Sequence, residues 1–235
     1  MIAYKFLAAG RRAPFSGMDW PEPGSWIEAE GPLERGFSGI HALRPQALLG
    51  WIDDELWTCE VAGAIEDDGD VIVAERGRLV ERVGAWNEVT AHDFARGCAA
   101  RGRELVLGAL RGEGYEDEAR ELEGLDATSF ATTAPRVAAQ LPLETAGLVV
   151  MAADTTALAE GRRPAEREPQ LRSHLEAVAA SRSTYGAIVA NVAFVVSHST
   201  AGLHPDGYEA GLAAERAWQL ERLLDGLGLA VPATA

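Results

Sequence analysis

The feature that most constrains the fold is a change of pattern between Val83 and Thr90. Before it, short runs of β-branched and aromatic residues alternate with turns rich in glycine, proline and aspartate, as strands do. After it, Thr90 is followed three residues later by Asp93, and apolar residues then recur at helical spacing, which is typical of a capped helix. The pattern predicts an α+β protein: a small β-rich unit at residues 1–86, followed by an antiparallel helical bundle at residues 88–230.

Strand and helix signals place the elements within both units. Predicted strands cover residues 2–7, 25–29, 39–43, 56–61, 71–74 and 79–83, with a helical turn at 45–51. Predicted helices cover residues 90–111, 116–122, 170–200 and 208–227, with one more from residue 142 and one that Asp126 or Thr128 caps. Because the segment Ala187–Val196 is apolar on nearly all sides, we expect it to be a central, buried helix.

Charge and composition exclude several classes of protein. The net charge of −15, from 36 acidic and 21 basic residues, repels a phosphate backbone, so nucleic acid is not an expected partner. The most apolar stretch is too short to cross a bilayer, and the start does not have the pattern of a signal peptide, so a membrane is not expected either. The two cysteines, Cys59 and Cys98, are expected to be reduced, which favours the cytoplasm.

Four short segments of the β-rich unit form a distinctive set. They are Tyr4-Lys5-Phe6-Leu7, Pro14-Phe15-Ser16-Gly17, Gly39-Ile40-His41-Ala42 and Glu55-Leu56-Trp57. Taken together they resemble an uncharacterised family of bacterial and phage proteins, whose members begin with a short Tyr-Lys-Phe strand. The resemblance covers roughly residues 1–80 and implies that this part is a domain of its own. It implies no mechanism, cofactor or oligomeric state.

Polar residues on three predicted strands are candidates for a site in the β-rich unit. Lys5, His41 and Glu60 together look like the strand-borne residues of ADP-ribosyltransferase-like folds. In those folds a basic strand, a middle strand and a late glutamate line a nicotinamide pocket. The alternative is that His41 forms local hydrogen bonds and Glu60 is a solvated strand residue.

Four of the six tryptophans lie within 40 residues of one another, at Trp20, Trp26, Trp51 and Trp57. Tryptophan buries a large apolar area, so in a small β unit it is commonly part of the core. It also forms flat walls in pockets that bind sugars and nucleotides. Both interpretations stay open at this point.

A second set of candidates lies in the predicted helices. Asn191 and His198 are seven residues apart and share a helix face with Thr184 and Ser181. In so apolar a helix, we expect Asn191 and His198 to be largely buried and hydrogen-bonded, with Asp154 as the acidic partner. Glu215 or Gln219 of the last helix is an alternative partner for His198. This polar set is expected to form either a ligand pocket or a structural clamp.

No metal is predicted, because the sequence has no pair of histidines at a metal-binding spacing. No cofactor is predicted either, because the sequence has no phosphate-binding glycine loop. Nucleophilic catalysis has no matching motif. The preferred hypothesis is therefore a binding or interaction module, with a small molecule or a protein as partner. The two alternatives are an enzyme that uses Lys5, His41 and Glu60, and a ligand site in the helical bundle around Asp154, Asn191 and His198.

Overall fold

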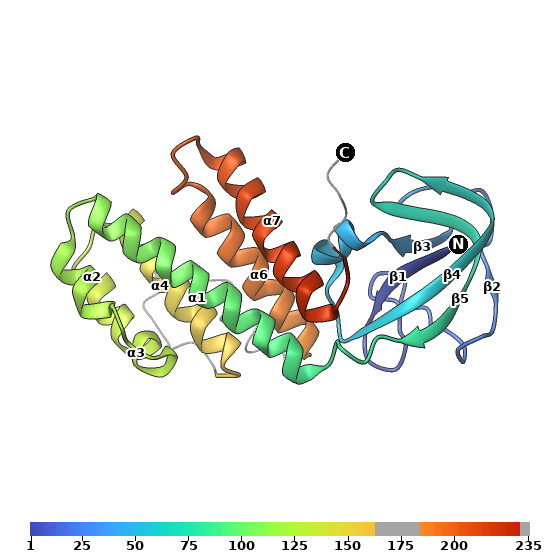
Figure 1. Ribbon diagram of the computed structural model, residues 1–235, viewed down its shortest axis with the longest axis horizontal. Coiled ribbons are helices and arrows are strands. Elements are labelled where there is room, and N and C mark those ends of the chain that lie inside the picture. The colour runs from blue at the N-terminus through green and yellow to red at the C-terminus, as the bar shows by residue number, and fades with distance from the viewer. Residues whose placement is uncertain (163–183, 231–235) are drawn as a thin grey trace. The chain divides into compact units, whose positions relative to one another are not determined.

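The computed structural model describes residues 1–162 and 184–230 (Figure 1). It confirms the predicted α+β class, with strands in the first part of the chain and helices after them. The chain groups into two compact units. One unit, the barrel unit, comprises residues 1–90 together with the chain from Leu220 on, and the other, the helical unit, comprises residues 91–219. That a cut between Gly84 and Thr90 would release two folded parts stays a prediction.

The barrel unit contains a closed circuit of antiparallel strands (Figure 1). Its strands are β1 (Ile2–Leu7), β2 (Ile27–Glu28), β3 (Ile40–Leu43), β4 (Glu55–Asp67) and β5 (Val71–Arg82). Because β1 pairs with both β3 and β4, and β5 pairs with the same two strands, four strands close into a small barrel. The short strand β2 adds to β5. A closed barrel leaves few strand edges open to other chains.

Side-chain alternation fills the barrel with apolar residues. Trp57, Cys59 and Val61 of β4 are all buried and face inward, whereas Thr58 and Glu60 between them are partly exposed. Lys5 lies directly opposite Trp57 in the β1–β4 ladder. Residues opposite one another share a face of the sheet, so the Lys5 side chain also lies on the inner face.

The hairpin of β4 and β5 is longer than predicted. Residues 71–74 and 79–83 were expected to form two strands, but residues 71–82 form one, and β4 extends to Asp67 instead of ending at residue 61. The polar residues Glu75 and Arg76 account for the difference. Their side chains are exposed, but Arg76 pairs with Glu28 of β2 and Ala29 N–H donates to Glu75 O, so the strand continues past them, with a register shift against β4 between Ala62 and Ile65.

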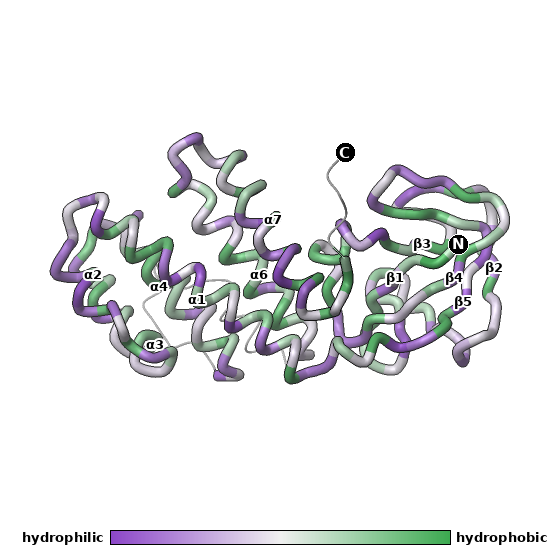
Figure 2. Tube along the Cα trace, viewed as in Figure 1, coloured by the Kyte–Doolittle hydropathy of each residue, from purple (hydrophilic) through white to green (hydrophobic). Residues whose placement is uncertain are grey.

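The helices follow the predicted order. After the 3-10 helix η1 (Pro45–Trp51) of the barrel unit, they are α1 (Glu88–Gly112), α2 (Glu116–Leu122), α3 (Ala127–Ala138), α4 (Leu143–Ala159), α6 (Tyr185–Ala201) and α7 (Tyr208–Leu227). Within the helical unit, α4 packs against both α3 and α6. Figure 2 shows apolar residues along α4 and α6. Among the described residues, none of the helices has the length and apolarity that a bilayer span requires.

Two helix starts differ from the prediction in an instructive way. Helix α1 begins at Glu88, because the side chain of Asn87 accepts hydrogen bonds from the backbone of Val89 and Thr90. Thr90 is therefore inside the first turn and is not the cap. Helix α6 begins at Tyr185, and the Thr184 side chain caps it by accepting from Ala187 N. The rest of the predicted helix, residues 170–183 with Ser181, lies outside the described residues.

The predicted buried stripe of α6 is its more exposed face. Thr184 and Phe194 are exposed, the latter by 55%, and Asn191 and His198 on the same stripe are only partly buried. The buried face of α6 instead carries small and β-branched residues such as Val189 and Val196. Both polar side chains are hydrogen-bonded, as predicted, but they are half-buried instead of largely buried. When a helix is apolar on all sides, its sequence does not show which side packs against the other helices. In α6 the exposed side also carries an apolar residue, Phe194.

Candidate functional site

The barrel wall is open between β1 and β3. These strands share a single pairing of Cα positions, Tyr4 with Leu43, and beyond it the second half of β1 pairs with β4 alone. The first half of β3 pairs with β5. Because neither half has a backbone partner on this side, the two strands part and leave a gap in the wall.

A pocket of about 520 Å³ occupies this gap. Its walls come from β1, β3, η1 and the loops that precede β2 and β3, and five of its residues are aromatic: Phe6, Phe15, Trp20, Phe37 and Trp51. Phe15 and Phe37 are more than 80% exposed at the rim, whereas Phe6 and Trp20 are buried. The volume falls within the range of small-molecule sites. None of the described lining residues is acidic, in a chain that has 36 acidic residues.

Lys5 supplies the cationic group of the pocket. Its Nζ donates a hydrogen bond to the carbonyl oxygen of His41 at 2.6 Å, across the gap between β1 and β3. The ammonium also lies 5.1 Å from the centre of the Trp20 ring, a cation–π contact. Within the described residues no carboxylate pairs with Lys5, so burial lowers its pKa to about 8.

The thiol of Cys59 faces the same interior but does not supply an anion for Lys5. Burial raises the pKa of Cys59 to about 11, although the charge of Lys5 acts in the opposite direction. Burial therefore shifts the pKa of each group toward its neutral form, although a lysine with a pKa of about 8 is still mostly charged at pH 7. Cys59 and Cys98 are both fully buried.

His41 holds the loop that forms one wall of the pocket. Gly36 N–H donates to His41 Nε2 at 2.9 Å, so the hydrogen is carried by Nδ1, which donates to Gly39 O at 3.1 Å. Desolvation is the main cause that lowers the pKa of His41, which keeps the ring neutral. With both ring nitrogens bonded to the backbone, His41 positions the loop around Phe37, as the local hydrogen-bonding alternative expected.

Glu60 does not join Lys5 and His41. It lies three residues from Trp57 on β4 and so points to the outer face of the barrel. There it forms an ion pair with Arg78, its cross-strand neighbour on β5, at 2.6 Å. The structure thus brings together two of the three residues that were compared with ADP-ribosyltransferase-like folds, and separates the third.

The four tryptophans at positions 20, 26, 51 and 57 serve different purposes. Trp57 is a core residue with 8% exposure, whereas Trp51 is only partly buried and lines the pocket. Trp20 does both, and its buried Nε1–H has no hydrogen-bond partner in the described part of the chain. Trp26 is exposed by 38% and lies against the guanidinium groups of two arginines.

Asn191 and His198 of the helical unit have separate hydrogen-bond partners. Asn191 donates to Ala187 O of its own helix at 2.8 Å. His198 Nδ1 lies 2.6 Å from the Tyr208 hydroxyl, and its ring lies 4.2 Å from that of Phe194. Asp154 is fully buried in α4, but it is not among the contacts described for Asn191 or His198. The described residues contain no cluster of potential ligands for a metal ion.

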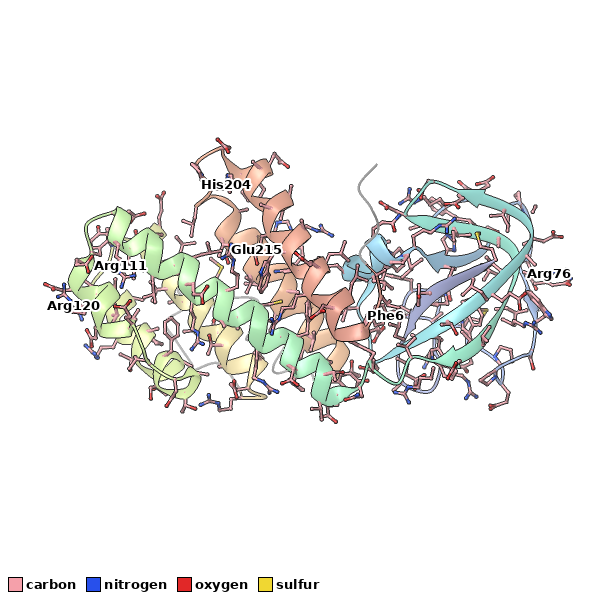
Figure 3. All side chains as sticks on the ribbon, in the orientation of Figure 1. Phe6, Arg76, Arg111, Arg120, His204 and Glu215 are labelled. Carbon is pink, nitrogen blue, oxygen red and sulfur yellow. The ribbon has the colours of Figure 1, made fainter. Side chains whose placement is uncertain are left out.

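A different buried polar group connects two helices of this unit. Glu215 of α7 is 4% exposed (labelled in Figure 3) and forms an ion pair with Arg101 of α1 at 3.5 Å. Gln219 donates to Ala193 O of α6 at 3.0 Å and to Glu215 at 3.4 Å. Burial raises the pKa of Glu215, and Arg101 partly offsets this effect. The sequence interpretation named Glu215 and Gln219 as partners of His198 but missed Arg101.

One signal in the sequence would have singled out Lys5 directly. It is the only lysine among 21 basic residues, all the others being arginine. An amine can lose its proton in a protein, whereas a guanidinium stays charged, so the two are not interchangeable at a buried site. The aromatic rim was harder to find, because Phe15 and Phe37 lie in segments without strand or helix periodicity.

Comparison with known proteins adds no family to these observations. No protein-family model, curated protein or solved structure matches the chain. The resemblance of residues 1–80 to a bacterial and phage family stays a prediction. Function must be inferred from the geometry of the site itself.

Proposed function

We propose that this chain is a cytoplasmic binding module whose N-terminal pocket holds a small, flat aromatic ligand with an oxygen acceptor directed at Lys5. The observation that carries the proposal is the combination of aromatic walls with one half-buried amine and no acidic residue among the described lining residues. Aromatic walls favour a flat apolar ligand. An amine with spare donors favours a carboxylate or carbonyl oxygen.

The unsatisfied donors of the pocket support an acceptor ligand. The Lys5 ammonium has three N–H groups, and one of them is used by His41 O. Trp20 Nε1–H is a further buried donor at the pocket wall. A buried donor without a partner costs about 1–3 kcal/mol, so a ligand oxygen that reaches Lys5 would recover part of this free energy.

The test is a titration of the full chain with aromatic acids of one and two rings, benzoate and 2-naphthoate, against their neutral amides. Five of the six tryptophans lie in residues 1–90, so fluorescence follows the melting of the barrel unit. A ligand at 100 times its Kd stabilises the unit by about 2.7 kcal/mol. We expect the acids to bind at least about tenfold more tightly than the amides, and the preference to be lost in Lys5→Met. Equal binding of both series, or failure of every acid, would refute the proposal.

His41→Ala provides a second readout on the same titration. Because His41 holds the Gly36–Gly39 loop by two hydrogen bonds, its removal should weaken binding of acids and amides by the same factor. A selective loss for the acids would instead mean that His41 contacts the ligand.

The enzyme alternative is tested in the same panel with NAD. Stabilisation by NAD that is lost in both Lys5→Met and Glu60→Gln would favour an ADP-ribosyltransferase-like site. The Arg78 pair of Glu60 on the outer face of the barrel favours the binding module.

A further inference from the structure

We infer that Lys5 is a carbonyl-capturing residue, whose ε-amino group forms a reversible imine with an aromatic aldehyde bound in the pocket. This inference rests on the proposed function, because it names the reactive group of the ligand that the pocket holds. It is carried by the position of Lys5, which is the only lysine of the chain and lines an apolar pocket at the gap in the barrel wall.

The surroundings of the amine suit condensation with a carbonyl. Ile40 and Leu43 of β3 and the aromatic walls give the site an apolar lining, so a bound aromatic aldehyde would displace water around the amine and favour loss of water from the adduct. The hydrogen bond to His41 O fixes the position of Nζ at the wall. After an imine forms and takes up a proton, its single N–H can keep this same acceptor, so the product is held as well as the free amine.

The step balances without another reactant. The lone pair of the neutral amine attacks the carbonyl carbon and forms the C–N bond, and the carbonyl oxygen then leaves as water with the two amine hydrogens. Neither partner is oxidised or reduced. Hydrolysis by one water reverses the step and returns the aldehyde.

Desolvation supplies the neutral amine that this step needs. With a pKa of about 8, roughly a tenth of Lys5 is uncharged at pH 7, against well under a thousandth of an ordinary lysine. The ionisable groups that face it are the Cys59 thiol on β4 and His41 on β3, with Arg35 in the loop before β3 acting on His41. None of these is an anion at pH 7, so none holds Lys5 as ammonium.

The described residues also explain why the chemistry should stop at the imine. His41 has both ring nitrogens bonded to the backbone, and Cys59, with a pKa of about 11, stays a thiol. No described acidic residue lines the pocket. Without a group that moves protons at the neighbouring carbon, the imine can form and hydrolyse but has no further reaction. Capture and release of an aldehyde is therefore the inferred activity.

The experiment treats the full chain with benzaldehyde and sodium cyanoborohydride at pH 7, which traps an imine as a stable benzyl amine. The chain has two primary amines, Lys5 and the α-amine of Met1, so peptide mapping gives the ratio of adducts at the two positions. The same reaction in urea gives the ratio for the unfolded chain. Propanal serves as an aliphatic probe, and Lys5→Arg confirms the assignment.

The expected result is a ratio of Lys5 to Met1 adducts at least about tenfold higher in the folded chain than in urea, and higher for benzaldehyde than for propanal. A ratio that is equal or lower in the folded chain overturns the inference. If benzoate still stabilises the protein in that case, the binding module survives and only the covalent step fails. If benzoate and 2-naphthoate also have no effect, the proposed function fails with it.

Discussion

Lys5 in the barrel unit, which is half-buried, and Glu215 in the helical unit, which is buried, are both partly desolvated ionisable groups, but their surroundings differ. Glu215 is satisfied from within the protein, by Arg101 and Gln219. Lys5 has one backbone carbonyl and, beside it, an open pocket. A desolvated charge whose partners all come from the protein contributes to structure. A desolvated charge that lacks an ion-pair partner and lies beside a cavity is suited to binding a ligand.

Three buried threonines of the helical unit are also satisfied from within the protein. Thr155 and Thr156 of α4 donate to carbonyl oxygens one turn earlier in their own helix, and so does Thr200 of α6. Such bonds satisfy the hydroxyl without help from another element. The comparison with Lys5 predicts that substitutions of such satisfied residues change the stability of the helical unit and leave ligand binding in the barrel pocket unaffected.

The largest effect is expected at Gly211 of α7, which lies against the end of α6. A Cβ added at Gly211 of α7 would overlap the carbonyl oxygen of Ala201 at the end of α6. Gly211→Ala should therefore destabilise the helical unit by about 3 kcal/mol, measured by urea unfolding followed by circular dichroism. The matched control is Gly108→Ala on α1, where the added Cβ meets open space and should stabilise by about 0.5–1 kcal/mol. Equal effects of the two changes would mean that α6 and α7 do not approach at this point.

The next largest effect concerns Lys5 and has the opposite sign. Its pKa is about 8 in the folded chain and 10.5 as a model value, so between these pH values the unfolded chain binds more protons and stability rises with pH. Below pH 8 the full cost of the buried charge applies, about 3 kcal/mol at about 1.4 kcal/mol per pKa unit. Lys5→Met removes this cost but leaves His41 O without its donor.

We therefore expect Lys5→Met to be more stable than the original chain by about 1–2 kcal/mol at pH 7, with the difference shrinking toward pH 10.5. Tryptophan fluorescence during urea unfolding measures it at several pH values. If Lys5→Met is less stable than the original chain at pH 7, the hydrogen bonds of the Lys5 ammonium outweigh its desolvation. Lys5 would then be satisfied by the protein in the same way as Glu215.

Glu215 gives a smaller pH dependence, because Arg101 offsets part of its burial. Burial raises the pKa of Glu215 above its ordinary value of 4.5. Between 4.5 and the raised pKa the folded chain therefore holds more protons than the unfolded chain at the same pH, and stability falls as pH rises through this window. Relative to Glu215→Gln, the original chain should lose stability over the same window. Glu209→Gln, on an exposed residue of α7, corrects for the loss of one negative charge. Parallel pH profiles for the original chain and Glu215→Gln would contradict the prediction.

The sequence predicted the helices and strands well, but it predicted poorly the pocket and the contacts that form between them. The strand at residues 2–7, the 3-10 helix at 45–51 and the helix at 208–227 were predicted with their observed bounds, because turn residues and periodicity mark both ends of each. The pocket depends on where two strands stop pairing, which is a long-range property of the ladder. The Arg101–Glu215 pair likewise joins positions more than a hundred residues apart, and local spacing carries no information about it.

The smallest effect is expected at Asn191, where the two interpretations of α6 differ most. A polar side chain in the bundle interior would leave partners stranded on its removal and would cost several kcal/mol in all. The structure instead places Asn191 on the partly exposed stripe with Phe194, and its amide donates to Ala187 O in the same helix. That carbonyl also serves as an acceptor in the helix ladder, so losing the side-chain donor leaves nothing unsatisfied. Asn191→Leu should therefore change the stability of the helical unit by no more than about 0.5 kcal/mol.

Asn191→Leu should also not alter binding of 2-naphthoate, because the amide has no part in the barrel pocket. Urea unfolding followed by circular dichroism measures the first quantity, and the naphthoate titration measures the second. A loss above about 2 kcal/mol would restore the buried stripe as a clamp and would mean that the exposed face of α6 has been assigned to the wrong side.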